Sequence, residues 1–310
     1  MFKEIKTIVI LGNGFDISHS IPSGYNDFKK YLQEKYGFCE KDCWPNIHSD
    51  MGNRGRVYVC EEESAKALFY GVESSFDNNW SGFEQDLAHM NFTEIIPTLD
   101  EFVSIDSEDD YSHYAQVYEN YKNNFLDNID LWKNIFNDWI TDINENIINS
   151  FNITIKPMFT KVFDKNTIVL SFNYTETVER LYNFNNVIHI HNKVGEPLVW
   201  GHGEKRKNIN KRYILDNKLF DKIVLNEYKK DTLKQINKFK KFFANLKDKT
   251  ITIYSYGFGY SKVDLVYIRK IIDKINVNSE WYLFDYKNSF AIQEKILRDC
   301  GFTGKIHKWI

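Results

Sequence analysis

The 310-residue chain is poor in cysteine, carries almost no net charge and contains no long apolar run. Four cysteines are too few for the disulfide framework of a secreted domain, so we expect reduced thiols. Lysine and arginine total 40 against 43 aspartates and glutamates, and the net charge of −3 excludes a whole-molecule attraction to nucleic acid or anionic membrane. No apolar run approaches the roughly 20 residues that cross a bilayer. With no cleavable leader pattern after Met1, these absences predict a cytoplasmic protein.

The cysteines raise the question of a metal site. Three of them and one histidine form a set of ligand-type residues: Cys39, Cys43, His48 and Cys60. Their spacing matches no standard zinc frame. We therefore interpret the cysteines as unrelated free thiols and predict no bound metal. Zinc binding by these four residues is the open alternative.

Apolar residues make up 43% of the chain and aromatic residues 16%, which is enough for a large hydrophobic core. Residues 5–11 form a β-branched run that stops at Gly12, as expected for a parallel strand buried on both faces. Comparable runs follow, each beside a segment of helical period: 167–172, 187–191, 250–256 and 281–284. Residues 305–309 alternate polar and apolar and are predicted to form an edge strand. The pattern predicts an α/β fold with a doubly wound parallel sheet of Rossmann-like type.

Between residues 36 and 165 the strand signals disappear, and we predict a mainly helical insertion that forms a cap. The Rossmann-like domain then comprises residues 1–35 and 166–310. Within the insertion, one set of apolar residues repeats every four positions: Leu131, Ile135, Trp139, Ile143 and Ile147. We interpret this stripe as core packing of a helix in preference to a ligand-binding surface.

Another helix is predicted over residues 229–247, where apolar residues recur at helical spacing: Leu233, Ile236, Phe239, Phe243 and Leu246. Its remaining surface carries four lysines: Lys230, Lys234, Lys238 and Lys241. We interpret these lysines as a solvated face. A nucleic-acid contact is the weaker alternative, because no arginines or surface aromatics interleave with them.

The loop Gly12-Asn13-Gly14 follows the first strand, where backbone N–H groups and a helix N-terminus can face a phosphate. Its two glycines would allow a phosphate to approach the backbone closely. The dinucleotide fingerprint requires a third glycine where this chain has Ile17, so a hydride-transfer enzyme is disfavoured. A purely steric need for glycine after a strand is the alternative to phosphate binding.

Several stretches carry a family pattern. Residues 10–16 read Ile-Leu-Gly-Asn-Gly-Phe-Asp, residues 21–28 read Ile-Pro-Ser-Gly-Tyr-Asn-Asp-Phe, and residues 171–175 read Ser-Phe-Asn-Tyr-Thr. Further matches lie in the remaining chain: Trp80, Phe83-Glu84, 188–191, 200–203 and 256–264. This pattern resembles the AbiH family of bacterial anti-phage abortive-infection proteins. The resemblance spans essentially the whole chain, and it implies a role in defence against phage.

The chain is also distantly similar to sirtuin-like NAD-consuming domains. The shared features are a Gly-x-Gly loop, an Ile-Pro pair, and polar residues after two later strands: Gly12, Gly14, Ile21, Pro22, Asn173 and His191. Thr175, Ser20 and Asn192 depart from the sirtuin pattern, and paired zinc cysteines beyond the histidine are absent. The similarity implies NAD as a substrate with no required cofactor, and the departures argue against protein deacetylation.

Asn173 and His191 each follow a predicted parallel strand, and their separation of 18 residues fits one strand-helix-strand step. We expect them to meet beside the glycine loop. Cleavage of the bond between nicotinamide and ribose develops oxocarbenium character, so an amide can position water or ribose hydroxyls while an imidazole accepts a proton. Asn173 and His191 are therefore the predicted catalytic residues. His189 shares a strand face with His191, and a hydrogen-bonded structural role is the alternative for both histidines.

Other residues are predicted to bind the nucleotide. Asp16 is expected to bind a ribose hydroxyl, and His202, between two glycines, is expected to line the same cleft. Support of a helix start is the alternative for Asp264. The complete predicted binding set is Gly12, Asn13, Gly14, Phe15, Asp16, Tyr25, His202, Ser261 and Asp264.

These inferences predict a defence protein that hydrolyses NAD or a related nucleotide at its N-glycosidic bond. One alternative is a non-catalytic nucleotide sensor that signals to a partner. Another is a nucleic-acid-cleaving effector, for which the sequence lacks a convincing carboxylate metal cluster. A phage-derived trigger and a homo-oligomer remain open as partners, although no heptad seam marks an interface. Neither nucleic acid nor membrane is expected as a partner.

Overall fold

The computed structural model describes residues 4–38, 65–66, 69, 72–73, 79–88, 130–147, 153–203 and 227–310. The chain forms two compact units. The first consists of Met1–Gly24, Asn137–Val199 and Lys230–Ile310, and the second of Tyr25–Phe136 and Trp200–Lys229. Much of the predicted insertion at 36–165 lies outside the described residues, as does the cysteine and histidine set considered for zinc, so both stay predictions.

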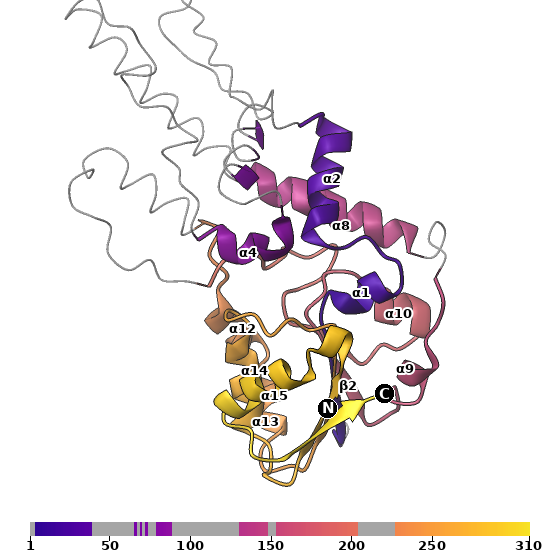
Figure 1. Ribbon diagram of the computed structural model, residues 1–310, viewed down its shortest axis with the longest axis vertical. Helices are drawn as coiled ribbons and strands as arrows, with labels where there is room; N and C mark the ends of the chain where they lie inside the picture. Colours follow the sequence, from indigo (N-terminus) through magenta and orange to yellow (C-terminus); the bar gives the residue numbers. More distant parts are fainter. Residues whose placement is uncertain are drawn as a thin grey trace, which may run out of the picture. The chain divides into compact units, whose positions relative to one another are not determined.

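The first unit is built on a six-stranded parallel sheet with the order β3-β2-β1-β4-β5-β6. Figure 1 shows this unit as a ribbon, with β2 labelled. The strands are β1 (Thr7–Leu11), β2 (Thr167–Ser171), β3 (Val187–His189), β4 (Thr252–Tyr256), β5 (Glu280–Phe284) and β6 (Lys305–Trp309). The order reverses between β1 and β4, which makes that junction the switch point of a doubly wound sheet. The predicted fold and the edge position of β6 are confirmed.

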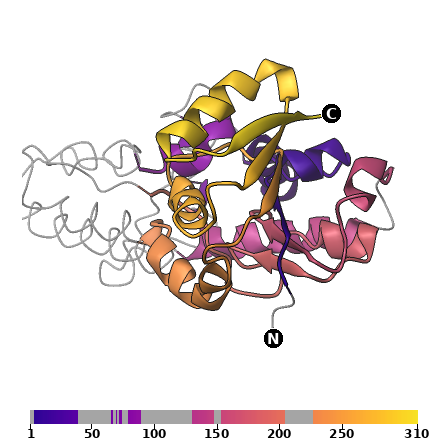
Figure 2. The same cartoon turned by 90° about the horizontal axis from the view of Figure 1, so that it is seen from below.

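Helices cover both faces of this sheet, as the view in Figure 2 shows. On one face α1 (Gly14–Ser18), α9 (Pro157–Thr160) and α10 (Thr177–Tyr182) contribute to a core with β1 and β2. On the other face α12 (Thr232–Lys238), α13 (Lys240–Asn245), α14 (Leu265–Ile272) and α15 (Phe290–Asp299) enclose a larger core. Burial of this apolar surface supplies the main stabilisation, at about 25 cal/mol per Å² removed from water.

Two predictions for residues 229–247 are wrong. The segment forms two helices, α12 and α13, in place of the single predicted helix, and Leu233 is 69% exposed. Lys230, assigned to the solvated face, is 3% exposed. The helix begins only after Lys230, because the side chain of Asp231 caps it by accepting a hydrogen bond from the backbone N–H of Lys234 at 2.9 Å.

The second unit contains α2 (Tyr25–Tyr36), the 3₁₀ turn η1 (Trp80–Gly82) and α4 (Phe83–Asp86). Its described aromatic side chains pack on one another, with Trp80 and Phe83 stacked at a centroid distance of 5.1 Å. The long helix α8 (Leu131–Asn146) runs from this unit into the first one. In the predicted apolar stripe along α8, the residues Ile135, Trp139, Ile143 and Ile147 are buried, which confirms that the stripe is core packing. Among the described residues, helices fall short of the length and apolar character that a membrane span requires.

Candidate functional site

The predicted site residues of the first unit lie in loops at one edge of the sheet. All six strands are parallel, so the loops after β1, β2, β3 and β4 leave from their carboxyl ends on the same side. Asn173, His191 and Asp264 lie in the loops after β2, β3 and β4, and Asp16 lies in α1, which follows the loop after β1. This edge is where open α/β sheets bind their ligands.

At the switch point the glycine loop packs directly on the loop after β4. A Cβ atom on Gly12 would lie 2.5 Å from the carbonyl oxygen of Gly257, and one on Gly14 would lie 2.6 Å from the Cα of Gly257. The N–H groups of Gly12 and Gly14 donate to the carbonyls of Tyr256 and Gly257 at 3.1 and 3.0 Å. The close loop contact therefore accounts for both glycines on steric grounds, and phosphate binding by this turn stays a prediction. Phe15 is fully buried in the core beside Phe159.

Asp16, in α1, is the centre of a buried polar cluster. Its side chain is 1% exposed, and its Oδ2 accepts a hydrogen bond from the Thr175 hydroxyl at 2.6 Å. The Thr175 and Thr177 hydroxyls are 2.9 Å apart. Burial raises the pKa of Asp16, an effect that hydrogen bonding from Thr175, Thr177, Asn173 and Ser23 opposes.

Asn173 belongs to the same cluster and is 6% exposed. Two oxygens of this pair, Asp16 Oδ1 and Asn173 Oδ1, are buried and have no hydrogen-bond partner among the described residues. Nearby, the Ser23 hydroxyl donates to Asn13 Oδ1 at 2.5 Å and holds the glycine loop against the following turn. The cluster thus contains two buried acceptor oxygens that the described residues leave without a hydrogen bond.

His191 belongs to a second buried group. Its Nε2 lies 3.1 Å from Asp264 Oδ1, and Lys230 Nζ lies 3.6 Å from the same oxygen. The other carboxylate oxygen of Asp264 accepts a hydrogen bond from the Ser261 hydroxyl at 2.8 Å. Burial by itself would raise the pKa of Asp264, but the charge of Lys230 and the imidazole of His191 beside the carboxylate hold that pKa well below its usual range.

Asp264 occupies the position before α14, yet its side chain makes no capping hydrogen bond to that helix. Its charge lies at the N-terminus of α14, as the alternative weighed for Asp264 requires. The carboxylate also faces the imidazole and the ammonium group, and Ser261 and Asp264, two predicted binding residues, are brought together with predicted catalytic His191.

His189 has neighbours different from those of His191. Its Nε2 lies 2.8 Å from Glu179 Oε1 on α10, and its Nδ1 lies 2.9 Å from the backbone carbonyl of Asn173. These bonds fit the structural role weighed for His189. They also tie β3 to the loop that carries Asn173.

The structure thus places Asn173 beside Asp16, and His191 beside Asp264, in separate groups of contacts. Tyr25 and His202 belong to the second unit. There the Tyr25 ring packs on Phe83 at 5.2 Å, and buried His202 pairs with Lys229 in a short β-bridge.

Sequence reasoning missed two sets of residues in these buried polar groups. Lys230 was grouped with the lysines of the following helix, although Asp231 is a capping residue type and signals that the helix starts after it. Nothing in the sequence pattern pointed to a contact of Thr175 or Thr177 with this carboxylate, because the hydrogen bond between Thr175 and Asp16 joins residues 159 positions apart. Only the fold brings these hydroxyls to the carboxylate.

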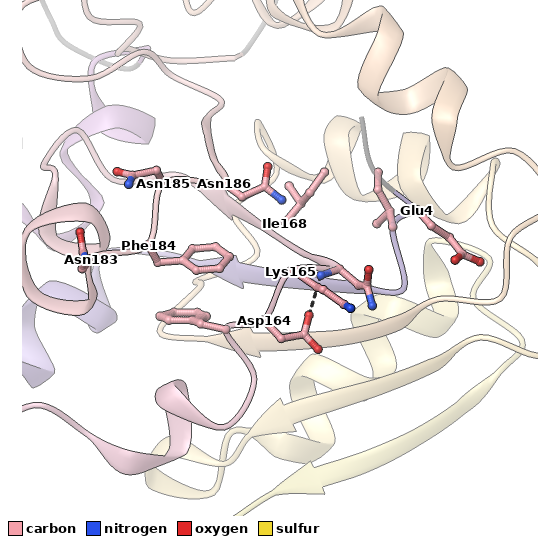
Figure 3. A pocket seen from close by; sticks show the side chains of 11 residues that line it. Glu4, Asp164, Lys165, Ile168, Asn183, Phe184, Asn185 and Asn186 are labelled. Atoms are coloured by element: carbon pink, nitrogen blue, oxygen red, sulfur yellow. Dashed lines mark hydrogen bonds between the residues drawn. The ribbon is translucent and has the colours of Figure 1, made fainter. Parts of the chain in front are cut away.

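A pocket of about 580 Å³ lies at the opposite edge, by the amino ends of the strands. Figure 3 shows its lining, which comes from the starts of β1 and β2 and from the segment between α10 and β3. Its polar groups are partly engaged: Asn186 donates to the carbonyl of Thr167, and Asp164 accepts from the backbone N–H of Asn166. The pocket contains none of the predicted site residues.

A family model described as "Bacteriophage abortive infection AbiH" matches residues 8–286. The match covers the glycine loop, both buried polar groups and five of the six strands. No curated protein matches the chain.

Proposed function

The chain belongs to the AbiH family of bacteriophage abortive-infection proteins, and we propose that its part in this defence is hydrolysis of NAD or a related nucleotide at the N-glycosidic bond. The nucleotide would lie across the carboxyl edge of the sheet, next to Asp16, Asn173 and His191.

The observation that carries the proposal is the pair of buried oxygens without partners, Asp16 Oδ1 and Asn173 Oδ1. Leaving a buried acceptor unsatisfied costs about 1–3 kcal/mol, so such a pair is expected where a ligand supplies the missing donors. A ribose presents two adjacent hydroxyls, and each can donate one hydrogen bond. A ribose-containing ligand therefore fits these two acceptors better than a carboxylate or a bare phosphate, which would repel the charge of Asp16.

The proposed reaction breaks the bond between the ribose C1′ and the nicotinamide nitrogen. The bonding electrons stay with the nitrogen, so the pyridinium leaves as neutral nicotinamide. Water adds its oxygen to C1′ and loses a proton, which His191 accepts. Asn173 would orient that water or the ribose hydroxyls, and Asp16 would fix the sugar by a charge-assisted hydrogen bond.

Incubation of the full chain with NAD, followed by chromatography, tests the proposal. We expect nicotinamide and ADP-ribose to appear in equal amounts, and an Asn185→Ala control at the opposite edge of the sheet to retain this activity. Binding of NAD in calorimetry without nicotinamide release, in the presence and absence of lysate from phage-infected cells, would instead favour the nucleotide sensor. Absence of both binding and release for NAD and related nucleotides would overturn the proposal.

A further inference from the structure

We propose that Thr175 and Thr177 are positioning residues whose hydroxyls form a directed pair of hydrogen bonds, from Thr177 to Thr175 to Asp16, that occupies Oδ2 of Asp16 and leaves Oδ1 to the nucleotide. The binding of a ribose hydroxyl by Oδ1 rests on the proposed function. The order of the two hydrogen bonds follows from the buried cluster itself and can be tested without a ligand.

The direction of the two hydrogen bonds follows from a count of protons. The Thr175 hydroxyl donates to Asp16 Oδ2 at 2.6 Å, which is the length expected for an O–H donor on an ionised oxygen. A hydroxyl has one proton, so Thr175 has none left for Thr177. The two threonine hydroxyls lie 2.9 Å apart, and Thr177 must therefore donate to the Thr175 oxygen. Both protons then point towards the carboxylate.

Burial makes these two hydroxyls important to the carboxylate. Asp16, Thr175 and Thr177 are 1%, 2% and 1% exposed. An ionised carboxylate so far from solvent must take its hydrogen bonds from the protein. The hydroxyls supply them at Oδ2, whereas Oδ1 has no hydrogen bond from the part of the chain that the structure describes.

The surroundings of Asp16 contain no charge that could do the same work. Among the described residues, the side chains that act on its carboxyl are those of Thr175, Thr177, Asn173 and Ser23, and all four are neutral near pH 7. Burial raises the pKa of Asp16, and Thr175 opposes this rise more than the other three do. Without the Thr175 hydroxyl, Asp16 would keep its proton to a higher pH and would be a poorer acceptor.

The backbone that carries the two threonines is itself held in place. Glu176 lies between them, and its backbone N–H donates to Oδ1 of Asn144 at 2.8 Å. The Glu176 side chain accepts a hydrogen bond from Lys193 at 2.6 Å. Asn144 is 3% exposed and belongs to α8, so a long helix anchors the segment. The hydroxyls are therefore fixed in position before a ligand arrives.

Carbon-13 NMR of the Asp16 carboxyl in the full chain, assigned by its loss in Asp16→Asn, tests the inference. Thr175→Val keeps the shape of the side chain but removes the hydroxyl, and in this variant Asp16 should ionise only at about tenfold lower proton concentration. Thr177→Val should act in the same direction by a smaller factor, because Thr177 acts on Oδ2 through Thr175. If Thr175→Val does not fold, Thr177→Val carries the same test.

Two matched variants serve as controls. Thr175→Ser keeps the hydroxyl, and Thr303→Val removes one from an exposed position, so Asp16 should ionise in both as in the unaltered chain. Unchanged ionisation of Asp16 in Thr175→Val and Thr177→Val would overturn the inference.

Affinity for ADP-ribose gives a separate readout. In Thr175→Val the profile of affinity against pH should move to higher pH by the same factor of about ten in proton concentration, because the ionised acceptor returns as the pH rises. Thr175→Ser should restore the original profile. A loss of equal size at every pH would show a merely structural role for Thr175 and would contradict the assignment. If NMR gives the expected shifts but the unaltered chain binds no ADP-ribose, the order of the hydrogen bonds stands and the proposed function fails.

Discussion

Gly14 and Gly257 pack backbone against backbone, at the point where the loops after β1 and β4 meet. A Cβ on Gly14 would lie 2.6 Å from the Cα of Gly257, and a Cβ on Gly257, at φ +60°, would lie 2.5 Å from the backbone N of Phe15. Backbone atoms cannot move aside as a flexible side-chain end can. The two loops can therefore approach only because both positions are glycine.

We predict that Gly14→Ala lowers the free energy of unfolding by about 2–4 kcal/mol, because overpacking against backbone has no cheap relaxation. Gly259→Ala is the matched control, since a Cβ there meets nothing within 4 Å. Denaturant unfolding of the two variants measures the difference. Equal stability would show that the loops separate easily, and would revive phosphate binding as the reason for Gly14.

The pKa of Asp16 leads to a second prediction. Burial raises the pKa of Asp16 in the folded chain above its unfolded value. Ionisation of Asp16 therefore lowers the free energy of unfolding. This loss is absent at low pH and appears as the pH rises through the unfolded and then the folded pKa. Asp16→Asn removes this loss. We expect the variant to be as stable as the unaltered chain near pH 7, or more stable by about 1 kcal/mol, while losing affinity for ribose-containing nucleotides.

Unfolding experiments between about pH 4 and pH 8 measure the change in stability, and calorimetry with ADP-ribose measures the change in affinity. The unaltered chain should lose stability relative to Asp16→Asn as the pH rises. If Asp16→Asn is markedly less stable at neutral pH and binds ADP-ribose normally, Asp16 is a structural residue. Asp299→Asn, at the exposed end of α15, is a suitable control.

Lys230 and Asp264 should show strong energetic coupling. Asp264→Asn removes the carboxylate charge that faces the buried Lys230 ammonium, which we expect to cost about 3–5 kcal/mol of unfolding free energy. The double variant Asp264→Asn with Lys230→Met should lose less stability than the sum of the two single losses, because the interaction between the two side chains is then counted only once. Additive losses in this double-mutant cycle would show that the two charges do not depend on each other.

The depressed pKa of Asp264 sets the pH range of this stabilisation. A carboxyl with a lowered folded pKa contributes stability above its unfolded pKa and loses it as the pH falls through the folded pKa. The destabilising effect of Asp264→Asn should therefore be full at neutral pH and shrink in acid below about pH 4. If the loss of stability in Asp264→Asn is constant down to strong acid, it arises from packing and not from the charge of Asp264.

The strands were predictable from sequence because their signal is local. The run Thr167–Ser171 has three consecutive apolar residues between a threonine and a serine, and every residue in it is buried. The polar groups were predictable only in part. A position after a parallel strand places Asn173 and His191 at the correct edge of the sheet, but it does not identify the residues that surround them. Those partners come from elements far apart in the chain, as with Lys230 and Asp264, and no periodicity records such pairings.

Asn173 and His191 are the two residues proposed to act on the nucleotide. Asn173→Ala and His191→Ala should each reduce the rate of nicotinamide release by roughly a hundredfold or more at saturating NAD, since positioning and proton transfer each contribute on that scale. Affinity for ADP-ribose should change little in His191→Ala but fall in Asn173→Ala, because Asn173 lies in the cluster with the open acceptors whereas His191 lies with Asp264.

Asn173→Asp separates the roles of the amide further. It keeps the shape and an acceptor but removes the amide donor and adds a second carboxylate close to Asp16, whose burial already disfavours ionisation. We expect that one of the two carboxyls in this variant stays protonated near neutral pH, and that turnover falls as in Asn173→Ala. Full activity in Asn173→Asp would show that the amide donor is dispensable. Full activity in both His191→Ala and Asn173→Ala would remove both residues from the reaction, and would leave the buried acceptors as a binding site without hydrolysis.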